Sequence, residues 1–280
     1  MTTYILTIQC PDAPGLVNRV TGALLEVGAN ITEAAQFTDP DTRIFAQRIV
    51  FDSPASLAEA RAALDPVSEA VGGTFTLRPR DARRRVLIMA SREEHCLLDL
   101  LFRHRNGELD IDIPLIISNH EERADLAHRY GIPFEHVPVT PETKTAAEKI
   151  LLERVERLGI DFVVLARYMQ ILSPEVCHAL EGRIINIHHS FLPGFKGARP
   201  YHQAHARGVK LIGATAHYVT TDLDEGPIIE QDVVRVDHAD SVEDMVRLGR
   251  DVERLVLSRA VRYQAEDRVI LLGSKTVVFS

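Results

Sequence analysis

The sequence predicts an α/β protein of two domains. A small βαββαβ domain is expected over residues 1–82, and a larger domain with a mostly parallel sheet over residues 83–280. Short strand and helix patterns alternate up to Leu77, whereas longer strand–helix units begin at Val86. The basic run Arg83-Arg84-Arg85 lies between the two patterns and is interpreted as a solvated linker.

In the first domain, Tyr4 to Ile8 is rich in β-branched residues and predicts a strand. Asp12 and Pro14 then favour the start of a helix, and Gly28 favours its end. The predicted order is strand 4–8, helix 16–25, strands 31–37 and 44–51, helix 54–64 and strand 74–77. This order is the ferredoxin-like arrangement.

Two segments of this domain carry a family resemblance: Cys10-Pro11-Asp12-Ala13-Pro14-Gly15-Leu16 and Gly28-Ala29-Asn30-Ile31. Together they resemble ACT domains, which commonly sense a small ligand, often an amino acid. The resemblance implies an effector site at Asp12, Gly15, Leu16 and Asn30, where N–H groups at a helix start can receive a carboxylate. Two alternatives remain: Asp12 and Gly15 only shape the helix start, or the domain serves only in subunit pairing.

The second domain is predicted from strands that alternate with helices. Strands are expected at 86–90, 111–117, 162–166 and 184–188, and helices at 97–101, 121–130 and 141–158. The apolar run at 162–166 is typical of a parallel strand buried on both faces. We therefore expect a Rossmann-like sheet with sites at the carboxyl ends of its strands. The sequence contains neither GxGxxG nor GxxxxGK[ST], so no motif supports dinucleotide or nucleoside triphosphate binding.

Composition excludes several function classes. The chain of 280 residues is 45% hydrophobic and 26% charged, as in ordinary globular proteins, and its net charge is −8. We therefore predict no nucleic-acid partner, because such proteins usually present a basic face. The first residues do not resemble a signal peptide, and no apolar run reaches the roughly 18 residues of a membrane span. With three widely spaced cysteines, these features predict a cytoplasmic protein with no membrane partner.

The segment from Arg183 to Pro193 combines a strand with an abrupt polar end. Side chains alternate along a strand, so Asn186 and His188 should point together. A second strand at 216–219 leads into an acidic turn that contains Asp224. An amide, an imidazole and a carboxylate at one sheet edge suit attack on a carbonyl. The amide would stabilise an oxyanion, the imidazole would transfer protons, and the carboxylate would orient the imidazole or hold water.

A longer pattern carries a second resemblance. Its parts are Asn186-Ile187-His188, Leu192-Pro193-Gly194-Phe195, His217-Tyr218-Val219 and Asp224-x-Gly226-Pro227-Ile228-Ile229. They resemble the folate-dependent formyltransferases, which include glycinamide ribonucleotide transformylase. The resemblance implies that Asn186, His188 and Asp224 are catalytic. It also implies a folate pocket at Tyr168, Met169, Gln170, Ile171 and Leu172, closed over the pterin by the turn that contains Thr220, Thr221 and Asp222.

Within that family the chain resembles the formyltetrahydrofolate deformylase branch. The resemblance rests on the segments 188–193 and 197–204 together with the ACT domain, and it covers essentially the whole chain. It implies hydrolysis of 10-formyltetrahydrofolate to tetrahydrofolate and formate, which supplies formate for purine biosynthesis and balances one-carbon folate pools. The segment from Ala90 to Cys96 supports this branch. In transformylases a glycine- and serine-rich loop binds the phosphate of the acceptor there, whereas this segment lacks glycine and contains Glu93 and Glu94.

Two other functions remain open. One is a formyltransferase that acts on an amine, although the net charge disfavours initiator tRNA as its acceptor. The other is a non-catalytic regulator whose second domain has lost activity, although the intact set of Asn186, His188 and Asp224 argues against such loss.

No cofactor and no metal are predicted. His188 and His189 are consecutive and should face opposite ways, and no Cys or carboxylate set completes a tetrahedral site with His202 and His205. Lys196 and Arg199 are expected either to meet the glutamate tail of folate or to be solvated. ACT modules often pair at their edges, so a homo-oligomer, either dimer or tetramer, is expected.

Overall fold

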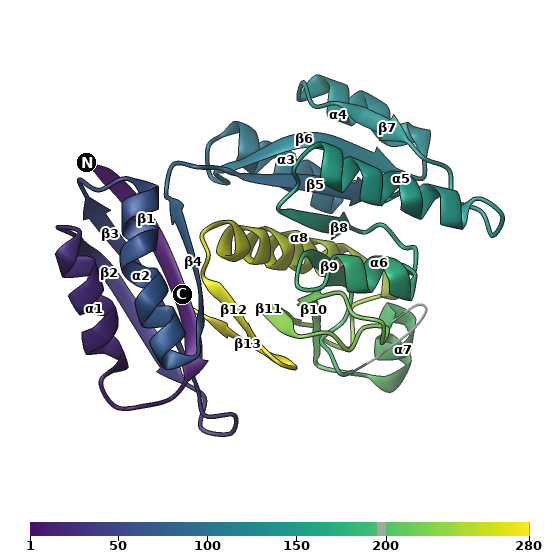
Figure 1. The fold of residues 1–280 in the computed structure, drawn as a ribbon. Helices are drawn as coiled ribbons and strands as arrows, with labels where there is room; N and C mark the ends of the chain where they lie inside the picture. Colours follow the sequence, from purple (N-terminus) through teal and green to yellow (C-terminus); the bar gives the residue numbers. More distant parts are fainter. Residues whose placement is uncertain (195–199, 280) are drawn as a thin grey trace. The chain divides into compact units, whose positions relative to one another are not determined.

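The computed structural model describes residues 1–194 and 200–279, which divide into two compact units (Figure 1). The first unit comprises Met1–Arg83 and Glu266–Ser280, and the second comprises Arg84–Ala265. The sequence analysis placed all of residues 83–280 in the second domain. The structure corrects this for the last fifteen residues, which belong to the first unit. The last residues belong with the first unit because they form a hairpin that packs on its sheet.

The first unit has the predicted βαββαβ order. Its elements are β1 (Thr2–Pro11), α1 (Leu16–Glu26), β2 (Asn30–Thr38), β3 (Ile44–Ser53), α2 (Leu57–Val71) and β4 (Thr74–Pro79). The strands form an antiparallel sheet in the order β2-β3-β1-β4, and α1 and α2 cover one face of it (Figure 1). A capping box between Ser56 and Glu59 begins α2, which continues through Pro66, beyond the predicted end at Leu64.

The other face of this sheet carries the C-terminal hairpin of β12 (Val269–Leu272) and β13 (Lys275–Val278). Ile270 and Leu272 of the hairpin pack with Ala46 of β3, whereas the adjacent Phe45 belongs to the core beneath α1 and α2. Strand β3 is therefore buried on both faces. The apolar face that the hairpin contributes explains why it groups with the first unit.

The second unit contains a seven-stranded sheet in the order β11-β10-β9-β8-β5-β6-β7. Strands β5 to β9 run parallel, and β10 and β11 are antiparallel additions at one edge. The elements are β5 (Arg84–Ala90), α3 (His95–Arg105), β6 (Ile111–Ser118), the 3₁₀ turn η1 (Glu121–Arg123), α4 (Ala124–Arg129), β7 (Phe134–His136), α5 (Lys144–Arg157), β8 (Phe162–Ala166), α6 (Pro174–Ala179), β9 (Ile184–His188), α7 (Pro200–Arg207), β10 (Leu211–Tyr218), β11 (Ile228–Arg235) and α8 (Val242–Ala265).

This arrangement confirms the α/β class and the mostly parallel sheet. Both faces of the central strands are covered. Leu87 and Met89 pack with residues of α5 and α6, while the alternate residues Val86 and Ile88 are equally buried. Strand β8 is buried along its whole length, as its continuous apolar run predicts. The carboxyl ends of β8 and β9 are neighbours at one edge of the sheet, where parallel α/β folds place their ligands.

Among the described residues, no helix is long and apolar enough to span a membrane.

Candidate active site

The candidate site begins at the carboxyl end of β9. Asn186 and His188 are two residues apart on this strand, and their side chains contact partners on the same side. Strand β10 runs antiparallel to β9 and places His217 directly opposite Asn186. Three polar side chains are thus concentrated at the carboxyl end of β9.

Asp224 reaches the same place from the turn between β10 and β11. Its backbone is left-handed, with φ of 57°, an uncommon conformation for a residue other than glycine. Two residues later Gly226 lies directly against β10, because a Cβ added there would be 1.8 Å from the carbonyl oxygen of Tyr218. The turn is therefore fixed by a close backbone contact that only glycine permits, and this contact holds the carboxylate beside β9.

His188 and Asp224 form the central contact of the site. Nδ1 of His188 lies 3.2 Å from Oδ1 of Asp224. Burial acts to raise the pKa of Asp224, but its interaction with His188 and the nearby imidazoles keeps that pKa below its usual value. The carboxylate therefore stays ionised and orients the ring. Nε2 of His188 is buried and has no hydrogen-bond partner among the residues described, so it is the nitrogen left for a reactant.

His217 orients the amide of Asn186. Nδ1 of His217 lies 2.8 Å from the carbonyl oxygen of Tyr218, which can only accept, so this nitrogen carries the proton. Nε2 of the neutral ring then accepts a hydrogen bond of 3.2 Å from Nδ2 of Asn186. Burial lowers the pKa of His217 and so preserves the neutral ring. The second N–H of the Asn186 amide remains available for an oxyanion.

His189 departs from the sequence-based expectation. Consecutive residues were expected to face opposite ways, but β9 ends at His188, and the rings of His188 and His189 meet edge to face with centroids 5.1 Å apart. Both rings line the cavity described below. The prediction was wrong here because strand alternation does not extend past the end of the strand.

A cavity of about 410 Å³ opens over these side chains, a volume within the usual range for small-molecule sites. The catalytic residues predicted from the sequence, Asn186, His188 and Asp224, all line it. So do seven predicted folate contacts: Met169, Gln170, Ile171, Leu172, Thr220, Thr221 and Asp222. The side chain of Tyr168 instead belongs to the buried core with Leu165 and Leu172. The structure adds Arg167, His189 and His217, which the sequence analysis did not assign to the site.

The expected effector residues are only partly together. Asp12, Gly15 and Leu16 line an open groove of about 590 Å³ in the first unit. Gly15 precedes α1 with φ of 87°, and Asp12 pairs with Arg43 at 3.2 Å. Asn30 lies at the start of β2 and is not among the residues that line this groove.

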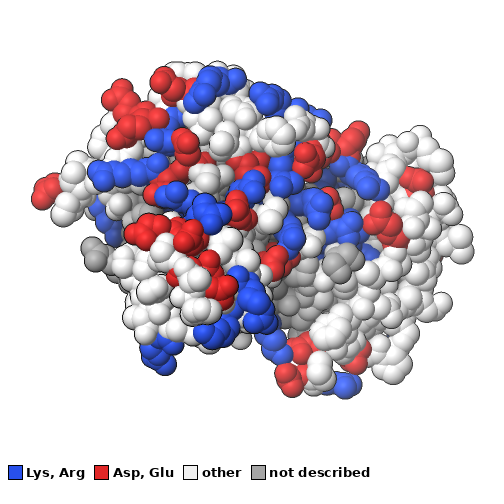
Figure 2. Space-filling model, turned by 180° about the vertical axis from the view of Figure 1, so that it is seen from behind, with Lys and Arg blue, Asp and Glu red and all other residues white. Residues whose placement is uncertain are grey.

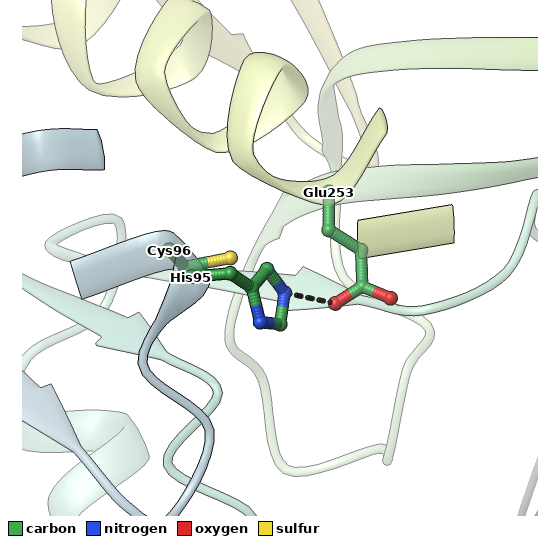
Figure 3. A group of neighbouring side chains, drawn as sticks. All are labelled: His95, Cys96 and Glu253. Atoms are coloured by element: carbon green, nitrogen blue, oxygen red, sulfur yellow. Dashed lines mark hydrogen bonds and ion pairs between the residues drawn. The ribbon is translucent and has the colours of Figure 1, made fainter. Parts of the chain in front are cut away.

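The segment between β5 and α3, where the resemblance led us to expect that no phosphate is bound, is joined to other elements by charged contacts. Glu93 pairs with Arg250 of α8 at 2.9 Å, and Glu94 pairs with Arg123. His95 contacts Glu253 of α8 at 2.9 Å (Figure 3). Carboxylates that already bind arginines do not form a cradle for a phosphate. Lys196 and Arg199, expected near the folate tail, lie outside the described residues.

His189 makes stability depend on pH. Burial, with the positive charges of Arg167 and His188, lowers the pKa of His189 from 6.5 to about 4. On acidification the unfolded chain therefore binds this proton before the folded chain does. The free energy of unfolding should be highest above pH 6.5 and fall as the pH is lowered toward 4. Denaturant unfolding at several pH values should show a shallower fall for His189→Gln. The matched control His205→Gln, at an exposed position of α7, should keep the wild-type slope. Equal slopes in wild type and His189→Gln would contradict this account.

Comparisons with known proteins agree with the division into two parts. Residues 84–261 match the formyl transferase family model, and residues 4–66 match the ACT domain model. The formyltetrahydrofolate deformylase of Bacillus subtilis is 49% identical over 280 residues, covering 98% of this chain and 93% of that protein. The crystal structure of formyltetrahydrofolate deformylase from Burkholderia mallei has a TM-score of 0.96 and 50% identity, covering 100% of both chains. A glycinamide ribonucleotide transformylase from Symbiobacterium toebii covers 73% of this chain and is matched over 98% of its own length, with a TM-score of 0.67 and 32% identity.

Proposed function

The chain belongs to the formyltetrahydrofolate deformylase family, and we propose that Asn186, His188 and Asp224 carry out its reaction, the hydrolysis of 10-formyltetrahydrofolate to tetrahydrofolate and formate. One observation carries the assignment. Asp224 holds Nδ1 of His188 at 3.2 Å, and the opposite ring nitrogen has no partner among the described residues beside the cavity. This is the arrangement that a general base requires.

The mechanism follows from these contacts. Nε2 of His188 takes a proton from water as the water oxygen bonds to the formyl carbon. The carbonyl oxygen becomes an oxyanion, to which the free N–H of Asn186 donates. His188 then returns the proton to the folate nitrogen as the carbon–nitrogen bond breaks. The products are tetrahydrofolate and formic acid, which loses its proton to solvent. Asp224 stabilises the imidazolium between the two transfers and does not itself take the proton.

The folate would occupy the rest of the cavity. Met169, Ile171 and Leu223 each expose more than half of their side chains around it, and all three are apolar. Isolated apolar residues are common on surfaces, but three around one cavity suit the flat rings of a pterin and its aryl neighbour. The polar residues Gln170, Thr220 and Asp222 would supply hydrogen bonds to the pterin.

Water is the acceptor that the site favours. An amine acceptor bound through a phosphate would need donors between β5 and α3, but this segment carries Glu93 and Glu94, both paired with arginines. The face drawn in Figure 2 offers no broad basic surface for an acceptor, because Lys and Arg are interspersed there with Asp and Glu. Formyl transfer to an amine is therefore not favoured.

An acceptor-free turnover assay tests the function. Purified protein supplied with 10-formyltetrahydrofolate and no amine should release tetrahydrofolate and formate in equal amounts. A reaction without protein serves as the control. Release that requires an added amine would identify a transferase, and calorimetric binding of folate without turnover would identify a non-catalytic regulator.

The first unit would regulate or assemble the enzyme. The groove lined by Asp12, Gly15 and Leu16 would take a small amino acid, since backbone N–H groups at the start of α1 suit a carboxylate. The exposed edge strand β2, with Ile31 and Phe37 partly uncovered, would support pairing into a homo-oligomer. The acceptor-free assay repeated with candidate amino acids, together with light scattering, tests both roles.

The reaction as written needs no cofactor and no metal. Among the described residues, His95, Cys96 and Glu253 place three potential ligand atoms within 4.8 Å of one another. Glu253 is already paired with Arg167, and burial raises the pKa of the Cys96 thiol well above its usual value, so this set suits a dication poorly. Turnover should therefore survive treatment with a chelator. The three buried free thiols support a reducing, cytoplasmic location.

A further inference from the structure

A buried charged cluster lies behind the wall of the active-site cavity. It consists of Arg167, which follows β8, Tyr201 on α7, Glu253 on α8 and His95 at the start of α3. Only Arg167 lines the cavity. The cluster brings together four elements that are far apart in the sequence, and the mechanism above uses none of its members.

Glu253 is the centre of this cluster. Its side chain is 1% exposed, and it accepts a hydrogen bond from Tyr201 at 2.7 Å. It also contacts His95 at 2.9 Å, as Figure 3 shows. Burial would raise the pKa of Glu253, but His95 and the charge of Arg167 hold it below its usual value. The carboxylate is therefore ionised inside the protein. A buried charge of this kind is costly unless it is paired, and Arg167 is its arginine partner, with Nε 3.3 Å from Oε2.

The cluster also fixes the position of its members. Gly249 of α8 lies so close to Tyr201 that an added Cβ would be 2.0 Å from the phenol oxygen. Arg167 has a left-handed backbone, with φ of 60°, directly after the last residue of β8. A left-handed backbone is strained for a residue other than glycine, so the surrounding contacts must offset that strain. The position of the guanidinium is thus set by the backbone that follows β8 and by its contact with Glu253.

Arg167 and the catalytic histidine line the same cavity. They follow neighbouring parallel strands, because Leu165 of β8 pairs with Asn186 of β9. Arg167 is the one lysine or arginine among the described residues that line the cavity, whereas Asp222 and Asp224 line it with negative charge. Nε of Arg167 is directed at Glu253, 3.3 Å away, whereas the buried Nη1 has no hydrogen-bond partner among the described residues. A fixed cation with an unused nitrogen donor therefore borders the cavity.

We propose that Arg167 is the formate-binding residue of this site, held in place by Glu253. The proposal rests on the proposed function, because hydrolysis turns a neutral formamide into an anion beside two aspartates. A guanidinium binds a carboxylate through paired N–H donors, which fits formate but offers little to the uncharged formyl group. Arg167 thus receives the product after the carbon–nitrogen bond breaks. Glu253 is a positioning residue, because it acts through Arg167 and does not line the cavity.

Product inhibition by sodium formate tests this assignment, with sodium chloride at equal ionic strength as the reference. Formate should inhibit the wild-type enzyme, and Arg167→Gln should raise its inhibition constant about tenfold or more, the usual range for losing a hydrogen bond to a charged group. Arg167→Lys should fall between the two, because lysine keeps the charge and loses the paired donors. The KM for the folate should change far less than the inhibition constant.

Arg154→Gln is the matched control. Arg154 pairs with Glu135 at 2.8 Å, its side chain is 19% exposed, and it does not line the cavity. This variant should keep the wild-type inhibition constant even if its melting temperature falls. If Arg167→Gln fails to fold, Arg167→Lys carries the comparison, and formate inhibition equal to wild type would overturn the assignment.

Binding of ¹³C-labelled formate, followed by NMR in the same preparations, separates this proposal from the reaction itself. Formate that binds wild type and Arg167→Gln equally, or that binds neither, overturns the formate site while acceptor-free turnover still supports the hydrolase. Formate binding that depends on Arg167 supports the site even in a protein that proves to need an amine acceptor.

Discussion

Replacing His188 by alanine is expected to lower kcat by about 10²- to 10⁴-fold, the usual contribution of a positioned general acid–base group. The imidazole is the only group in the proposed mechanism that moves a proton between water and the folate nitrogen. Its ring is 5% exposed and contacts Asp224, so no neighbour can take its place without rearrangement. Acceptor-free release of tetrahydrofolate measures the effect.

The same variant must remain folded for that result to count. Circular dichroism and thermal unfolding should show a native protein, and folate should still bind, since the apolar part of the cavity is untouched. His205→Ala, at an exposed histidine of α7, is the matched control and should retain wild-type turnover. Turnover near the wild-type rate in His188→Ala would remove this residue from the mechanism.

Replacing Asp224 by alanine should be of similar severity. Loss of the carboxylate that orients a catalytic histidine costs on the order of 10⁴-fold in serine proteases, where the same division of roles occurs. Here Asp224 lies 3.2 Å from Nδ1 of His188, so its removal leaves the catalytic ring without the anion that orients it. Asp224→Asn tests charge separately from shape, because the amide keeps the size of the carboxylate. Both variants should lose turnover, measured by the acceptor-free assay.

The pH dependence of stability gives Asp224 a second readout. Its pKa in the folded protein lies below the unfolded value of about 3.9. Its stabilising contribution is therefore fully present above that unfolded value and is lost as the pH falls through the folded pKa. Asp224→Asn should lack this acid-range loss, whereas Asp251→Asn, at an exposed position of α8, should keep it. Asp224→Asn with wild-type turnover and an unchanged acid profile would contradict both its catalytic role and its ionised state.

The proposed formate site links these predictions to product release. His188 and Asp224 act on the bonds that form and break, whereas Arg167 acts on the anion that leaves. The two roles separate experimentally, because kcat should collapse when His188 or Asp224 is replaced, and formate inhibition should weaken when Arg167 is replaced. Glu253 supports the second role, because it fixes Arg167 from a position outside the cavity.

Local patterns in the sequence were sufficient for much of the fold. The strands at 162–166 and 184–188 have the predicted bounds, because continuous burial and a sharp polar end leave a clear signature. Alternation along β9 also placed Asn186 and His188 correctly on one side. The C-terminal hairpin was not predicted, because its strands are only four residues each. Its apolar side chains pack against the distant strand β3, and no local pattern indicates that contact.

The remaining parts of the site depend on contacts between distant elements. The family resemblance named Asp224, but only the antiparallel pairing of β10 with β9 and the close contact at Gly226 put its carboxylate beside His188. No sequence pattern assigned His189, Arg167 or Glu253 to the site. In a sequence, a polar residue that is buried cannot be distinguished from one that is exposed, because burial depends on its tertiary contacts. The sequence by itself determined which residue types could attack a formyl group and on which strand they lie. The tertiary structure alone decided which charges face one another, because electrostatic energy depends on distance and burial, and neither can be read from position in the chain.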